Sequence, residues 1–195
     1  MCETSQEYTA ISLESQGSGE GTGGLVLLTI APPLALRLVL CQVDRPFRDT
    51  GTRMSVPLAL GERAVFRKTV SESDVYLFAG ITGDLHANHV DEATMRKSPY
   101  GGRIAHGALL VGYMSAASTR IVSSMPADSP VMPVSLGYDR IRFLKGVPIG
   151  ETIEVRYVID AIDTARARSE AAIEIVNEAG EIVCAARHIL KFVPI

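Results

Sequence analysis

The stretch ITGDLHANHVDE, residues 81–92, gathers two histidines, three acids and an asparagine within twelve positions. Asp84 and His89 stand five residues apart, close enough to share one water molecule. An imidazole titrates near neutral pH, and a neighbouring carboxylate raises its basicity. Such a pair can orient a water molecule and transfer its protons. The stretch is therefore a candidate acid/base site, with a metal site and a polar loop capping the next helix as alternatives.

A metal site would draw its ligands from Asp84, His86, His89 and Asp91. No partner ligand stands elsewhere at a suitable spacing. Two histidines in a loop are a weak metal signature without a third anchored ligand. We therefore expect no metal at this position.

Regular patterns flank these residues. Alternation over 62–70 predicts a strand. Ser71 and Asp74 then match a capping box for a helix over 74–82 that ends at Gly83. A short helix or turn is expected over 89–97, and a loop over 98–107. The stretch 107–125 is apolar on nearly all sides, which predicts one long buried helix.

The remainder of the chain alternates with a period of two and predicts four strands, at 134–144, 151–162, 167–177 and 181–193. This order of elements predicts an α+β fold in which an antiparallel sheet wraps around the one long helix. No internal repeat is visible.

Composition narrows the possible functions. The chain has 195 residues and a net charge of −3 without a long basic run, so nucleic acid is not an expected partner. Cys2, Cys41 and Cys184 are far apart, which argues against a disulfide framework or a zinc ribbon and favours the cytoplasm. The apolar run 24–43 is broken by Pro32-Pro33 and Arg37, so neither a membrane span nor a signal peptide is expected.

With these patterns in place, the sequence resembles the MaoC-type dehydratases, the family of (R)-specific enoyl-CoA hydratases with the hot-dog fold. The resemblance covers roughly residues 58–195 and rests on FAGITGDLHANHVDEA, GGRIAHGALLVGYMSA and YDRIRFLKGVPIGETIEV. The family pattern is Gly-Asp, any residue, Asn-Pro, an aliphatic residue and His. Asp84 and His89 match this pattern. His86, Ala87 and Asn88 stand where the family has its asparagine, proline and aliphatic residue. His86 must take over from the family asparagine that orders the loop, or the loop is built differently.

The resemblance implies a lyase of fatty acid metabolism that hydrates an enoyl-CoA or dehydrates a 3-hydroxyacyl-CoA. Asp84 and His89 would hold the water and carry the proton transfers. Gly107, at the start of the long helix, would offer a backbone N–H to the thioester oxygen. The CoA thioester is the substrate, and no cofactor is expected. A tight turn into the helix is the plainer role for Gly107.

Other residues are expected to support this site. Ser115 aligns with a family serine near the catalytic pair, although it could simply be a small helix-packing residue. His86 and Asn88 would order the loop, and a buried structural hydrogen bond is favoured for His106. The basic residues nearest for the CoA phosphates are Arg96, Lys97 and Arg103, each of which could equally be a solvated surface residue.

The resemblance also implies a homodimer whose two sheets join edge to edge, with the acyl-CoA site near the interface. Two other functions stay open. A hot-dog thioesterase would direct the water at the thioester carbonyl, and a non-catalytic acyl-CoA-binding subunit would account for the altered His86-Ala87-Asn88 segment.

The chain is expected to divide near Met54. Residues 1–53 form an N-terminal extension, and 54–195 form the MaoC-like domain. The composition of 1–23 is typical of disorder. Either Met54 is the true start and the leader is a non-native upstream translation, or 25–43 packs as an added arm on the dimer. In both cases we expect the extension to be dispensable for folding and catalysis.

Overall fold

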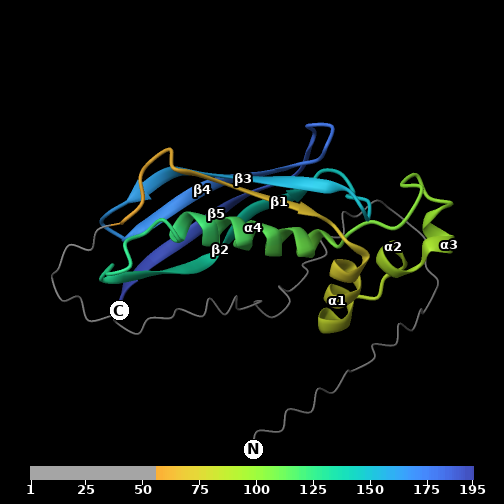
Figure 1. Cartoon of the computed structure of the whole chain (residues 1–195), viewed down its shortest axis with the longest axis horizontal. Helices are drawn as coiled ribbons and strands as arrows, with labels where there is room; N and C mark the ends of the chain where they lie inside the picture. Colours follow the sequence, from red (N-terminus) through yellow and green to blue (C-terminus); the bar gives the residue numbers. More distant parts are fainter. Residues whose placement is uncertain (1–55) are drawn as a thin grey trace, which may run out of the picture. The chain divides into compact units, whose positions relative to one another are not determined.

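The computed structural model describes residues 56–195 (Figure 1). The expectations for the extension 1–53 and for its cysteines lie outside these residues. The elements are β1 (Arg63–Thr69), α1 (Glu72–Thr82), α2 (Ala87–Val90), α3 (Glu92–Met95), α4 (Gly107–Val122), β2 (Val131–Phe143), β3 (Thr152–Asp163), β4 (Arg168–Val176) and β5 (Ile182–Pro194). In this part of the chain, no helix combines the length and the apolar character that a membrane crossing requires.

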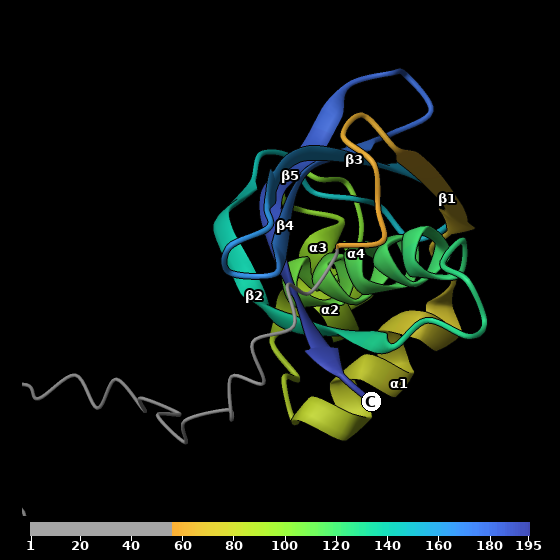
Figure 2. The same ribbon diagram turned by 90° about the vertical axis from the view of Figure 1, so that its left-hand side faces the viewer.

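The five strands form one antiparallel sheet in the order β1-β3-β4-β5-β2. Figure 2 shows the sheet arching around α4. Alternate residues of the central strands face inward, so that in β3 Ile153, Val155, Tyr157 and Ile159 are all buried. Each such side chain contributes roughly 1.5–3 kcal/mol when fully buried. The predicted α+β architecture is confirmed.

The structure corrects the prediction that α4 is buried on nearly all sides. Met114, Ala117 and Ile121 are buried against the sheet, but Gly112 and Ser115 are exposed. The sheet covers only one side of the helix. Small residues occur on both sides, so the apolar pattern alone did not separate the two faces. The helix also ends at Val122 rather than at residue 125.

The capping box at the start of α1 is confirmed, with the Asp74 N–H donating to Ser71 Oγ at 3.2 Å and the Ser71 N–H donating to Asp74 Oδ2 at 2.8 Å. The helix ends at Gly83, whose φ of 77° is left-handed and costs glycine little. The single short helix expected over 89–97 is instead two one-turn helices. Asp91 separates them, because its carboxylate caps α3 by accepting the Thr94 N–H.

Strand β2 lies at one edge of the sheet and pairs with β5 through two register shifts. On the neighbouring strand β5, buried His188 contacts Ser135 Oγ through Nε2 at 2.8 Å and the Tyr157 hydroxyl through Nδ1 at 2.9 Å. Burial lowers the pKa of His188 to about 4. Cys184, also in β5, is a buried free thiol whose pKa burial raises to about 11.

Candidate active site

The loop that carries the candidate acid and base begins where α1 ends. The left-handed turn at Gly83 places Asp84 directly after the helix, with its side chain exposed. His86 caps α2, since its Nδ1 accepts the Asn88 N–H at 3.4 Å, and its own N–H reaches Asp84 Oδ1 at 3.4 Å. His86 therefore orders the loop by capping, which is the task expected of the residue that replaces the family asparagine.

His89 is buried in the one-turn helix α2 that follows, and one hydrogen bond sets its tautomer. Its Nδ1 lies 2.8 Å from the carbonyl oxygen of Ile104. A carbonyl can only accept, so Nδ1 carries the proton and Nε2 keeps a free lone pair. Burial lowers the pKa of His89 and outweighs the bond to Ile104 and the charge of Asp84, which act to raise it. Asp84 thus raises the basicity of His89 as expected, but burial lowers the pKa of His89 by more.

His106 joins the pair from the start of α4. Its ring is buried and stacks on His89, with centroids 3.7 Å apart and planes 25° apart. Its Nε2 donates to the backbone carbonyl of Asp84 at 2.9 Å, a buried structural hydrogen bond of the expected kind. Within residues 56–195 its Nδ1 has no hydrogen-bond partner. His106 therefore holds Asp84 by its backbone and supports His89 by stacking.

The three residues that converge are Asp84, His89 and His106, with one potential ligand atom of each within 4.8 Å of the others. This set differs from the alternative drawn from the sequence, since His86 and Asp91 serve as helix caps. Ring-nitrogen lone pairs lie in the ring planes. Stacked rings therefore direct them along nearly parallel planes rather than toward one point about 2.0–2.1 Å from both nitrogens. The arrangement suits proton transfer better than metal binding.

Gly107 begins α4 beside this cluster. A Cβ at this position would lie 2.9 Å from the ring of Phe143, so that only glycine fits without moving the ring. The first N–H groups of a helix lack intrahelical acceptors and carry the positive end of the dipole. The Leu109 N–H already donates to the His106 carbonyl, and no acceptor for the Gly107 N–H occurs within the described part of the chain.

A hollow of about 300 Å³ adjoins His89 and Gly107. Its wall combines apolar side chains such as Ile104, Leu110 and Phe143 with polar groups that include His89 and Lys145. Such a hollow suits an acyl chain whose thioester meets the polar groups at one end. A larger hollow of about 440 Å³ lies along β3 and the β4–β5 turn, with Arg67, Glu154 and Arg156 among its lining residues. It contains none of the three clustered residues, so we place the site at the smaller one.

Ser115 lies outside the three-residue cluster, on the exposed side of α4. Burial raises the pKa of the Tyr138 hydroxyl, and the side chain of Ser115 lowers it in part. Arg96, the C-cap of α3, and Lys97 after it are exposed, and their role toward CoA phosphates stays a prediction. Arg103 is instead largely buried and pairs with Glu72 and Glu92, so its charge is already compensated.

An arched antiparallel sheet around one helix defines the hot-dog fold, and here an Asp–His loop lies beside a hollow. The family model of the MaoC like domain matches residues 58–179, and the chain belongs to this family.

Curated relatives agree with this assignment. The (R)-specific enoyl-CoA hydratase of Rhodospirillum rubrum is 31% identical over 102 residues, which cover 52% of this chain and 66% of that protein. The 3-hydroxybutyryl-CoA dehydratase of Methylorubrum extorquens is 32% identical over 115 residues, which cover 59% of this chain and 69% of that protein. The aligned segment thus spans slightly less than two thirds of the first relative and slightly more than two thirds of the second.

Solved structures share the fold. The unliganded R-hydratase of Pseudomonas aeruginosa superposes with a TM-score of 0.59 and 26% identity over 72% of this chain and 90% of its own. The (R)-hydratase from A. caviae gives a TM-score of 0.62 over 70% and 98%, and its identity of 19% supports the fold alone. The hot-dog fold expected from the resemblance is confirmed.

Proposed function

We propose that the protein is a hydro-lyase that adds water across the 2,3 double bond of an enoyl-CoA, or removes it from a 3-hydroxyacyl-CoA. The observation that carries this proposal is the convergence of Asp84 and His89 beside Gly107, next to a hollow that apolar side chains line in part. Two relatives are named as a hydratase and a dehydratase of such thioesters, which supports the same reaction here.

In the hydration direction, a water molecule lies between the Asp84 carboxylate and His89 Nε2. The free lone pair of Nε2 accepts a proton as the water oxygen bonds to C3. The electron pair of the double bond moves toward C2 and the thioester oxygen. The Gly107 N–H stabilises the negative charge that develops on this oxygen. A proton from the Asp84–His89 pair then reaches C2, so that one water has been added in total.

A hydration assay across enoyl-CoA chain lengths, starting from crotonyl-CoA, tests the proposal. Loss of the conjugated double bond and formation of the (R)-3-hydroxyacyl product are expected. Release of free CoA from saturated acyl-CoA, without hydration, would instead identify a thioesterase. Binding of acyl-CoA without turnover of any substrate would identify a non-catalytic subunit.

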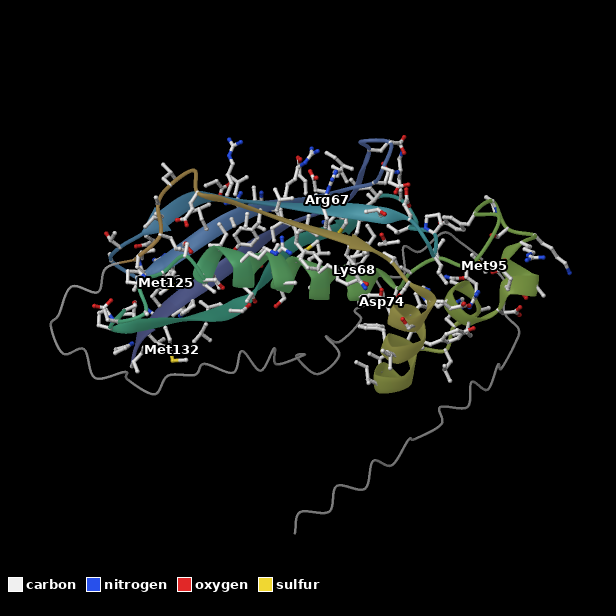
Figure 3. All side chains as sticks on the ribbon, in the orientation of Figure 1. Arg67, Lys68, Asp74, Met95, Met125 and Met132 are labelled. Carbon is white, nitrogen blue, oxygen red and sulfur yellow. The ribbon has the colours of Figure 1, made fainter. Side chains whose placement is uncertain are left out.

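The protein is further proposed to be a cytoplasmic homodimer. Strand β2 is an edge whose exposed residues Met132, Val134 and Leu136 alternate along one side. In Figure 3 the Met132 side chain extends away from the ribbon of β2. An exposed apolar edge strand favours pairing with another strand, and a second copy satisfies this symmetrically. The exposed small residues Gly112 and Ser115 would let the α4 helices of two copies approach closely.

Sedimentation of two lysine variants tests the dimer. Val134→Lys would place a charge within the proposed interface and is expected to give a monomer. Val65→Lys is the matched control, because Val65 is similarly exposed but lies on the opposite edge strand β1. If the parent protein sediments as a stable and active monomer, the dimer proposal is wrong.

A further inference from the structure

Arg103, in the loop before α4, is the centre of a charge cluster outside the reacting groups. Its guanidinium pairs with the carboxylate of Glu72, donates from Nη1 to the Tyr76 hydroxyl at 2.7 Å and donates from Nε to Glu92 Oε2 at 3.0 Å. The arginine side chain is only 13% exposed. The carboxylates raise the pKa of Arg103, so the charge is permanent.

The three partners lie on both sides of the catalytic loop, residues 83–91. Glu72 and Tyr76 belong to α1, which precedes the loop, and Glu92 begins α3, which follows it. Figure 3 labels Asp74 in α1 and Met95 in α3, which mark these two helices. One side chain thus connects the two ends of the loop that carries Asp84 and His89.

Ile104, the residue after Arg103, makes the contact that fixes the tautomer of His89. Ile104 accepts the Nδ1 proton of His89 at 2.8 Å and donates its N–H to the Asn88 carbonyl at 3.0 Å. The arginine is therefore held to α1 and α3 at the point where its own chain contacts the loop. A planar guanidinium can bind in three directions at once, which an ammonium on a flexible stem does less well.

We infer that Arg103 is a positioning residue for the proposed reaction, which holds the Ile104 carbonyl against His89 so that Nε2 faces the substrate water. The inference rests on the proposed hydratase function. It assigns Arg103 a role different from binding CoA phosphates, because a substrate phosphate would have to compete with two carboxylates of the protein itself.

Arg103→Met tests the inference. Small misplacements of a catalytic group cost up to ~10²-fold in rate, so we expect kcat to fall roughly 10- to 100-fold, with KM changed less than about threefold. Arg103→Lys keeps the charge without the planar fork and should give an intermediate kcat. A phosphate-binding role would instead raise KM for acyl-CoA and leave kcat nearly unchanged, which would overturn the inference.

Arg187→Met is the matched control. Arg187 also bridges two carboxylates, those of Asp160 and Glu170, but all three residues lie on the sheet strands β3, β4 and β5. Arg187→Met is therefore expected to leave kcat within about twofold of the parent, since neither Asp160 nor Glu170 contacts the catalytic loop.

NMR of ¹⁵N-labelled histidine gives a second readout that does not depend on activity. In the parent, His89 should show one tautomer with the proton on Nδ1, and in Arg103→Met a mixture of tautomers. If Arg103→Met does not fold, Glu72→Gln removes only the half-exposed α1 partner and should shift His89 in the same direction. An unchanged His89 tautomer in folded variants would overturn the inference. If the parent hydrates no enoyl-CoA, the proposed function fails, while this spectrum still decides whether Arg103 holds His89.

Discussion

The imidazole rings of His89 and His106 stack with their centroids 3.7 Å apart, although the two residues belong to different elements. His89 lies in α2, five residues after the exposed Asp84, and His106 is the N-cap residue of α4. His89 donates its Nδ1–H to the backbone carbonyl of Ile104, and His106 donates its Nε2–H to that of Asp84. A charge on either ring disfavours a charge on the other. The stack thus helps to keep His89 neutral and able to accept a proton.

Removing either member of the candidate pair should nearly abolish hydratase activity. General acid and base groups contribute ~10²–10⁴-fold, so Asp84→Asn and His89→Gln are each expected to lower kcat/KM by that range. Asp128→Asn changes an exposed carboxylate on a turn and should behave as the parent. Enoyl-CoA hydration kinetics and circular dichroism of the variants make the measurement. Losses below tenfold in both folded variants would remove the pair from the mechanism.

Gly107→Ala should reduce turnover far more than stability. The added methyl meets the Phe143 ring at 2.9 Å, but this side chain is 53% exposed and can move aside. The methyl would remain at the N–H group proposed to stabilise the thioester oxygen. Removing one such donor costs about 10²–10³-fold in kcat, and we expect a similar loss.

The control for this variant is Gly80→Ala in α1, an exposed helical glycine whose added methyl would meet no atom within 4 Å. It should stabilise the protein by about 0.5–1 kcal/mol at unchanged activity. Equal kcat for Gly107→Ala and the parent would show that this N–H is not the oxyanion donor.

Acid should destabilise the protein through His188. Its folded pKa of about 4 lies below the ordinary value of 6.5, so between these values the unfolded chain binds a proton that the folded one excludes. The stabilisation is complete above pH 6.5 and declines as the pH falls toward 4, by at most about 3 kcal/mol. The lowered pKa of His89 adds a contribution of the same sign.

Urea unfolding between pH 7 and pH 4 measures this dependence. His188→Gln should lose most of the slope. Tyr157→Phe removes a hydrogen-bond partner of His188 but keeps the histidine, so it should lower stability and retain the slope. A parent protein whose unfolding midpoint does not change over this range would contradict the assignment.

The fragment 54–195 should fold and retain full activity. The family match starts at residue 58, after the predicted boundary at Met54. Soluble expression, thermal unfolding and hydration kinetics of the fragment and of the full chain make the comparison. An insoluble or inactive fragment beside an active full chain would place residues 1–53 within the working protein.

Much of the fold follows from local patterns. The alternation of apolar and polar residues predicted the ends of β3 and β4 to within one residue, because one face of each strand packs on the core. The capping box and Gly83 located the ends of α1, and hence the loop that begins at Asp84. The exposed side of α4 was missed, since glycine, alanine and serine suit a helix surface that is buried and one that is not.

The supporting contacts of the site could not be predicted from the sequence. The Ile104 carbonyl that orients His89 is a backbone group, which leaves no signature in the residue type. Arg103 reaches Glu72 across 31 positions, a pairing that only the folded chain creates. The direction in which the pKa of His89 shifts depends on its burial, which the spacing of residues in the sequence does not reveal.

Cys184 gives the domain an intrinsic probe of its own opening. It is the sole thiol between residues 54 and 195, and it lies buried in β5 with a pKa of about 11. A thiol reagent needs both access and thiolate, and the closed sheet supplies neither. The rate at which a reagent modifies the fragment 54–195 therefore reports how often the sheet opens around β5, which pairs with both β4 and β2. Ligands that bind the closed form should slow this modification in proportion to their occupancy.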